Sequence, residues 1–206
     1  TTEIYTLSLH DALPISRPGA ALIRFAPTLD GGTIVLGGDS LVVDSDVAID
    51  ATELPAGLVV SGVRSSRGFE IIEGRTVSIA GLTVTRGGLN DPRYAVGAGL
   101  LNDGNLSLAR VKVTNCIGIG DWGADGGGIG NSGSLSLVEC SVTINGVFNG
   151  FGGGIYNGGR LILERSTISS NSADDGGGGG IFNDGDLLQI VNLTIANHDA
   201  YHGSGG

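Results

Sequence analysis

One unit is repeated four times in the second half of the chain. Each copy has a glycine-rich lead-in, an apolar residue, an asparagine, a short turn, alternating apolar residues and a second asparagine. The first asparagines of the copies are Asn102, Asn131, Asn157 and Asn183, and the second ones are Asn115, Asn145, Asn171 and Asn197. The spacings are 29, 26 and 26 residues in the first series and 30, 26 and 26 in the second. A nearly constant period of this size predicts a supersecondary unit that stacks on copies of itself.

Apolar residues alternate within each copy, which is the pattern of a β-strand. Leu161 and Leu163 flank Ile162, and no stretch has helical periodicity. A coil of about 26 residues with three short strands would return each strand in parallel beside its own copy, roughly 4.8 Å away. We therefore predict an all-β fold, a right-handed parallel β-helix solenoid with about 26 residues per coil.

The asparagines and glycines fit the corners of such a coil. Asparagine tolerates left-handed backbone angles and hydrogen-bonds its own backbone. At the same corner of successive coils, the side-chain amides can bond one another as a ladder. We interpret all eight asparagines of the two series as structural ladder residues. The chain has 39 glycines among 206 residues, against a usual share of about 7 %, and the triple glycines indicate bends where a β-carbon would clash.

The regularity of the chain changes along its length. Residues 96–206 form the regular coils, whereas residues 31–95 contain short apolar runs at less even spacing, such as Thr33–Leu36, Leu58–Val60 and Val77–Ile79. Residues 1–16 share nothing with the repeats and resemble the conceptual translation of a short-read sequencing adapter. We expect residues 1–16 to stay outside the folded core, and residues 17–206 to be an incomplete, uncapped piece of a parallel β-helix assembled from such reads.

Charge and cysteine content narrow the range of partners. The chain has 21 acidic against 11 basic residues, a net charge of −10, so nucleic acid is excluded as an expected partner. No apolar run is long enough for a transmembrane helix. Cys116 and Cys140 fall at different places around the predicted coil, with Val111 and Ser166 equivalent to Cys140 in the neighbouring copies. We therefore expect no disulfide between them, and a buried side chain at Cys140.

The segment GGGIYNGGRLILERSTISSNSA, residues 152–173, resembles the repeat of a family of bacterial right-handed parallel β-helix proteins. The segment VSIAGLTVTRGG, residues 77–88, is similar to the lead-in of that family. A looser likeness is to the repeats of polymorphic outer-membrane proteins. The resemblance implies an exported protein, extracellular or on the cell surface, that is adhesin-like or pectate-lyase-like. It implies no catalytic residue, because the shared motif is structural.

The copies differ most between the second asparagine and the next glycine run. We expect these stretches to be loops that stack along a single edge, often the binding edge of a solenoid. Exposed aromatics beside carboxylates suit sugar stacking and hydrogen bonds to sugar hydroxyls, so the expected partner is a glycan. The candidate ligand-binding residues are Asp121, Trp122, Phe148, Phe151, Asp174, Asp175, Tyr201 and His202.

Two functions remain open from the sequence. The first is a rigid scaffold, adhesin-like or glycan-contacting, and the second is a polysaccharide lyase or glycoside hydrolase on a pectate-lyase-like β-helix. An enzyme would gather three or more ionisable residues on one outer strand face, whereas charged residues such as Lys112, Glu139 and Arg165 alternate in sign. The sequence therefore favours the scaffold. It indicates no cofactor except calcium, for which Asp44 and Asp46, expected to share one strand face, are the candidate ligands.

Overall fold

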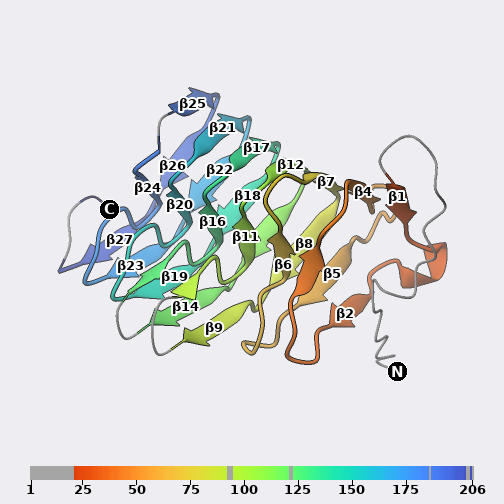
Figure 1. Ribbon diagram of the computed structural model, residues 1–206, viewed down its shortest axis with the longest axis horizontal. Coiled ribbons are helices and arrows are strands. Elements are labelled where there is room, and N and C mark those ends of the chain that lie inside the picture. Colours follow the sequence, from red (N-terminus) through yellow and green to blue (C-terminus); the bar gives the residue numbers. More distant parts are fainter. Residues whose placement is uncertain (1–20, 92–94, 121–122, 186, 203–204, 206) are drawn as a thin grey trace.

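The computed structural model describes residues 21–91, 95–120, 123–185, 187–202 and 205. They form a parallel β-solenoid of about six turns, with successive turns about 27 residues apart (Figure 1). Strand β1 lies at one end of the solenoid and β25 to β27 lie at the other. The parallel β-helix predicted from the repeat is confirmed. Residues 1–16 lie outside the described ranges, so the adapter interpretation stays a prediction.

Three long sheets run the length of the solenoid, and every strand pair in them is parallel. Sheet A consists of β1 (Ala21–Arg24), β4 (Val47–Asp50), β7 (Thr76–Ala80), β12 (Asn105–Ala109), β17 (Ser134–Val138), β21 (Arg160–Glu164) and β25 (Leu187–Val191). Sheet B consists of β2 (Thr33–Val35), β5 (Leu58–Ser61), β8 (Leu82–Thr85), β13 (Lys112–Thr114), β18 (Ser141–Thr143), β22 (Thr167–Ser169) and β26 (Thr194–Ala196). Sheet C consists of β3 (Leu41–Val43), β6 (Phe69–Ile71), β11 (Leu100–Asn102), β16 (Ile129–Asn131), β20 (Ile155–Asn157) and β24 (Ile181–Asn183).

A fourth sheet is present only in the later turns, so the expectation of three strands per coil is wrong there. Sheet D consists of β9 (Gly88–Asp91), β14 (Ile117–Gly120), β19 (Gly146–Phe148), β23 (Ser172–Asp174) and β27 (Asp199–Tyr201). The short pair β10 (Ala95–Val96) and β15 (Ala124–Asp125) follows it, and a 3-10 turn, Pro27–Leu29, connects β1 to β2. Among the described residues, no helix is long and apolar enough to cross a membrane.

The interior is built from columns of identical or similar apolar residues. Leu137 pairs with Leu163, which pairs with Ile190, so Leu163 is fully buried between coils as the repeat predicts. In sheet B the column runs through Val84, Val113, Val142 and Ile168. Alternate residues point outward because side chains in a strand alternate between its two faces. The short apolar runs of the first half also form strands, as predicted.

The first asparagine series forms a ladder inside the corner between sheets C and A. The Nδ2 of Asn102 donates to Oδ1 of Asn131 at 2.7 Å, and Asn131 donates in the same way to Asn157 at 2.6 Å. Asn157 donates to Asn183 at 2.6 Å. Asn102, Asn131 and Asn157 are fully buried. A buried amide would be costly alone, and each ladder amide finds its partner in the adjacent coil.

The second ladder differs from the expected one by one residue in two coils. Its members are Cys116, Asn145, Asn171 and His198, whereas Asn115 and Asn197 occupy the preceding corner position, with left-handed backbone angles. The backbone N–H of Cys116 donates to Asn145 Oδ1 at 3.0 Å, and that of Asn145 donates to Asn171 Oδ1 at 2.9 Å. Asparagine at the left-handed position is favoured for a different reason, its conformational tolerance.

His198 ends this ladder as a neutral imidazole in a defined tautomer. Its Nδ1 accepts the backbone N–H of Asn171 at 3.2 Å, so Nε2 carries the proton and donates to the carbonyl of Ile168 at 3.1 Å. At the other end of the ladder, burial raises the pKa of the Cys116 thiol to about 12. Both cysteines are free and buried, and the sequence predicts the burial of Cys140.

The triple glycines make room for the second ladder. A β-carbon on Gly154 would lie 2.7 Å from Asn171 Nδ2, and one on Gly128 would lie 2.9 Å from Asn145 Nδ2. A β-carbon on Gly153 would lie 2.1 Å from the carbonyl oxygen of Ser172 in sheet D. The glycine run therefore packs directly against the ladder and against the back of sheet D, as the predicted steric clash requires. Beyond it, Ala95, Ala124, Val147 and Ala173 form a second, smaller core.

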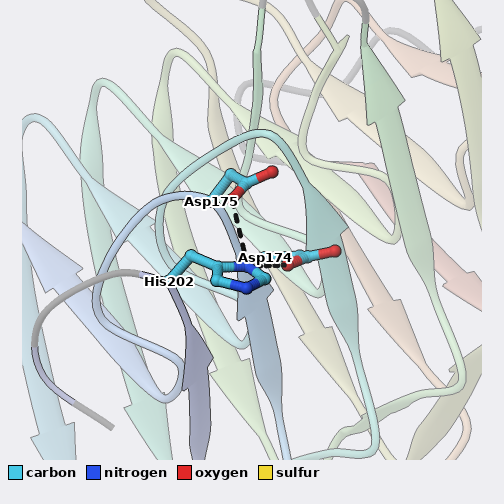
Figure 2. Close-up of side chains that lie close together, drawn as sticks. All are labelled: Asp174, Asp175 and His202. Carbon is cyan, nitrogen blue, oxygen red and sulfur yellow. Dashed lines mark ion pairs between the residues drawn. The ribbon is translucent and has the colours of Figure 1, made fainter.

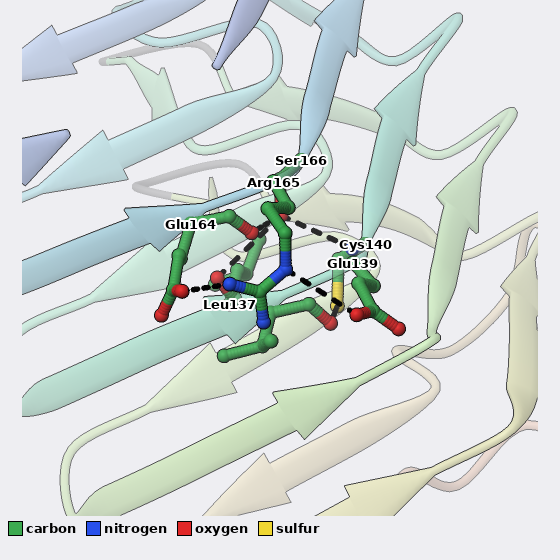
Figure 3. Close-up of polar contacts among 7 residues, drawn as sticks. Leu137, Glu139, Cys140, Glu164, Arg165 and Ser166 are labelled. Atoms are coloured by element: carbon green, nitrogen blue, oxygen red, sulfur yellow. Dashed lines mark hydrogen bonds and ion pairs between the residues drawn. The ribbon is translucent and has the colours of Figure 1, made fainter. Parts of the chain in front are cut away.

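The corner between sheets A and B carries charges outside and small polar groups inside (Figure 3). Arg165 lies between two carboxylates, with its Nε 3.3 Å from Oε1 of Glu139 and a second ion pair to Glu164. Beneath them, the hydroxyl of Ser166 accepts the backbone N–H of Cys140 at 3.1 Å. The predicted equivalence of Cys140 and Ser166 is confirmed by the register, and the charges of Glu139, Glu164 and Arg165 are paired with one another at this corner.

Candidate functional site

Three of the predicted binding residues form one row on the outer face of sheet D. Phe148 pairs in register with Asp174, which pairs with Tyr201. Their strand neighbours Val147 and Ala173 point into the second core, so the row itself faces outward. Phe148 is 46 % exposed and Tyr201 57 % exposed. The row thus places an aromatic ring on each side of a carboxylate, in three successive coils.

Two further predicted residues adjoin this row at the corner that follows sheet D. Asp175 and His202 both have left-handed backbone angles, with φ of 57° and 55°, and occupy equivalent positions in adjacent coils. The Nδ1 of His202 lies 3.2 Å from Oδ1 of Asp175 and 3.6 Å from Oδ1 of Asp174 (Figure 2). We call the five residues Phe148, Asp174, Asp175, Tyr201 and His202 the sheet D patch.

The stretches expected to be stacked loops are therefore partly strands. Gly146–Phe148 and Ser172–Asp174 pair in parallel because small residues such as Ala173 fit against the narrow second core. Residue pattern does not indicate these strands, since glycine and aspartate are rare in strands. Asp121 and Trp122, the remaining candidates in this stretch, lie outside the described residues.

Phe151 belongs to a different cluster from the sheet D patch. Its ring lies 4.5 Å from that of Phe182, whose ring in turn stacks at 5.8 Å on Tyr156. Tyr156 and Phe182 pair in register on sheet C. Burial raises the pKa of Tyr156, and the nearby carboxylates of Asp125 and Asp184 raise it further. This cluster is not among the sequence predictions, although Tyr156 in GIYN and Phe182 in GIFN occupy the same position in two successive repeats.

The sheet D patch contains a group of potential metal ligands. One ligand atom each from Asp174, Asp175 and His202 can be chosen so that all lie within 4.8 Å of one another. Two carboxylate oxygens and an imidazole nitrogen suit a transition metal such as Zn²⁺ better than calcium, which prefers oxygen ligands alone. Asp174 is half-buried, Asp175 is exposed, and His202 has 79 % of its side chain accessible.

The expected calcium ligands Asp44 and Asp46 lie elsewhere. They do not share a strand face, because both fall in the turn between β3 and β4. The carboxylate of Asp46 accepts the backbone N–H of Thr76 at 2.8 Å, which holds the start of β7. Within the described ranges, neither residue belongs to a group of three potential ligands. Asp46 therefore has an evident structural role.

The arrangement of the sheet D patch favours contact with a ligand over chemistry. Of the potential metal ligands Asp174, Asp175 and His202, only Asp174 lies on a strand, whereas Asp175 and His202 lie at the corner. General acid–base catalysis benefits from a water-excluding environment that positions the reacting groups. The large exposed fractions of Tyr201 and His202 instead describe an open surface.

No protein-family model matches the chain, no curated protein is significantly similar to it in sequence, and no solved structure is significantly similar to it. The observed parallel β-solenoid is consistent with a β-helix repeat protein.

Proposed function

We propose that this chain is a rigid scaffold of an exported bacterial protein and that its sheet D patch contacts glycans outside the cell. The observation that carries the proposal is the register that aligns Phe148, Asp174 and Tyr201 on three adjacent strands. At roughly 4.8 Å per coil, the two aromatic positions are about 10 Å apart. This separation lets a saccharide chain contact both rings and the carboxylate between them.

The chemistry of the patch supports a carbohydrate ligand. The apolar C–H face of a sugar packs on aromatic rings, which supply large contact area. Carboxylates such as Asp174 and Asp175 accept hydrogen bonds from sugar hydroxyls. Because every strand of the patch is held by parallel pairing on both sides or at one edge, little conformational entropy would be lost on binding.

A polysaccharide-cleaving activity is the second candidate, and the close approach of His202 to two carboxylates is what favours it. We rank it below binding because two of the three groups lie at a corner and are exposed. A single variant separates the two functions. If the patch only binds, the parent chain should retain glycans without releasing reducing sugar ends, whereas release by the parent that stops in His202→Ala would favour the enzyme.

The test of the binding proposal is a glycan array probed with and without calcium. The double variant Phe148→Ala, Tyr201→Ala should lose most of the signal of the parent chain. Ile144→Ala is the matched control, since Ile144 is 57 % exposed on a different corner. Equal signals for the double variant and the parent, or binding to no glycan, would leave the scaffold without a glycan-binding role at this face.

A further inference from the structure

A shallow groove crosses the outer face of sheet A, away from the sheet D patch. Its volume is about 300 Å³, at the lower end of the roughly 300–1,000 Å³ usual for small-molecule sites. The side chains that line it come from β12, β17 and β21, which lie side by side in Figure 1. They are Asn105, Ser107, Ser134, Ser136, Arg160 and Ile162.

Strand register explains how these side chains meet. Asn105, Ser134 and Arg160 are direct neighbours in one row, and Ser107, Ser136 and Ile162 are neighbours in the next. The serines are shorter than the arginine and isoleucine that follow them, which leaves the surface hollow beside β21. The groove is therefore a product of residue size at two outward positions of the repeat.

The polar groups of the groove are available to a ligand. Within the part of the chain that the structure describes, the hydroxyls of Ser107, Ser134 and Ser136 have no side-chain hydrogen bond. Hydroxyl and carboxamide groups both donate and accept, which matches the hydroxyls of a sugar. Ile162 adds an apolar surface for the C–H face of a sugar ring.

Arg160 gives the groove a charge opposite to that of the whole molecule. No described residue forms an ion pair with it, and none of the described residues that line the groove is a carboxylate, although the chain carries a net charge of −10. Glu164, at the next outward position after Ile162, pairs with Arg165 instead. An exposed guanidinium with free donors is suited to bidentate binding of a carboxylate.

We propose that this groove binds a carboxylate-bearing saccharide, with Arg160 on the carboxylate, the serines and Asn105 on the hydroxyls, and Ile162 beneath the ring. This inference goes beyond the proposed function, because it concerns another face and a charged ligand. It stands or falls independently of the sheet D patch.

The experiment is calorimetric titration of the full chain with a trisaccharide of mannuronate. Its methyl ester has the same rings without the charge and serves as the ligand control. The parent should bind the free acid at least about tenfold more tightly than the ester, since a charge-assisted bidentate pair is lost. Arg160→Gln should abolish that preference, whereas Arg86→Gln, which removes an exposed cation outside the groove, should retain it.

A second variant tests the shape of the groove. Ser136→Phe fills it and should abolish binding of both ligands, with an unchanged circular dichroism spectrum. Equal affinity for acid and ester, equal losses in Arg160→Gln and Arg86→Gln, or full binding by Ser136→Phe would overturn the proposal. The double variant Phe148→Ala, Tyr201→Ala should bind the free acid like the parent, which separates this site from the sheet D patch.

Discussion

The early and the late turns of the solenoid solve the same packing problem with different residues. At the end of the sheet C strands, the early turns place Val43 and Ile71 in the position that Asn102, Asn131 and Asn157 occupy later. All five side chains are buried, and the column is continuous in register. The backbone geometry therefore accepts either chemistry, and a polar residue is tolerated where the next coil supplies its partner.

The two regions also differ in cross-section. Of the turns described, those before β9 use three sheets, whereas the later ones add sheet D and its small core of alanine and valine. Between the two cores of the later turns lie the glycine run and the ladder of Asn145 and Asn171. The fourth sheet thus occurs in the same turns as the glycine run and the polar ladder, which allow sheet D to pack closely against the rest of the coil. Sheet D carries the proposed glycan-binding patch.

The largest effect is expected from an apolar column that both regions share. Leu163→Ala should lower the free energy of unfolding by about 2–5 kcal/mol, because it leaves a cavity between fully packed coils. Denaturant melts of this variant and of Ile144→Ala, whose side chain is exposed, measure the difference. Equal midpoints for the two variants would contradict the assignment of Leu163 to the core.

A smaller effect is expected from the feature that distinguishes the late turns. Asn131→Ala should cost about 1–3 kcal/mol, because the amide of Asn102 and the carbonyl oxygen of Asn157 lose their buried partner. Asn105→Ala removes an exposed asparagine from the adjacent strand and should cost little. If the two variants melt alike, the ladder is not what stabilises the late turns.

The smallest effect is expected where the second ladder begins. Cys116→Asn should raise the free energy of unfolding by about 0.5–1.5 kcal/mol, because the introduced carboxamide oxygen could accept the backbone N–H of Gly87 that now faces the sulfur. The space around residue 116 is comparable to that around Asn145. A β-carbon built on Gly99 would lie 3.0 Å from Cys116 Sγ, and one built on Gly128 would lie 2.9 Å from Asn145 Nδ2. Cys116→Leu is the control and should be less stable than the parent. A marked loss in the asparagine variant would show that the ladder cannot extend toward the early turns.

The sequence predicts the main coil well because its signal is local and repeated. Alternation of Leu135, Leu137, Leu161 and Leu163 identifies sheet A, and the first asparagine series aligns as the ladder does. The prediction for the second series is wrong in two coils, because asparagine identity and residue spacing point to different positions there. Its first interval is 30 residues, whereas the first interval of the other ladder is 29, and a 29-residue step from Asn145 leads to Cys116.

The candidate site was less predictable than the core. Residue type alone indicates Phe148, Asp174 and Tyr201 as candidates. Only the parallel pairing of strands with weak strand propensity brings them into one row. The sheet A groove has no sequence motif, because it results from the small size of serines opposite Arg160 and Ile162 in the next coil. The row on sheet D and the groove on sheet A both depend on which side chains lie side by side in adjacent coils. The alternation of residues within one strand gives no information about these neighbours.

Because the strand register is the same from turn to turn, a solenoid of this kind can be shortened or lengthened by whole coils. Each strand in the middle of a sheet pairs only with the strands of the adjacent turns, so removing residues 131–156 would join Gly130 to Asn157 and bring the equivalent Asn102 and Asn157 into neighbouring turns. The shortened rod would lose roughly 4.8 Å with its corners still aligned. Duplication of a coil would lengthen the rod by the same amount. Insertion or deletion of gene segments of this period would therefore change the distance between surface sites in fixed increments of one coil.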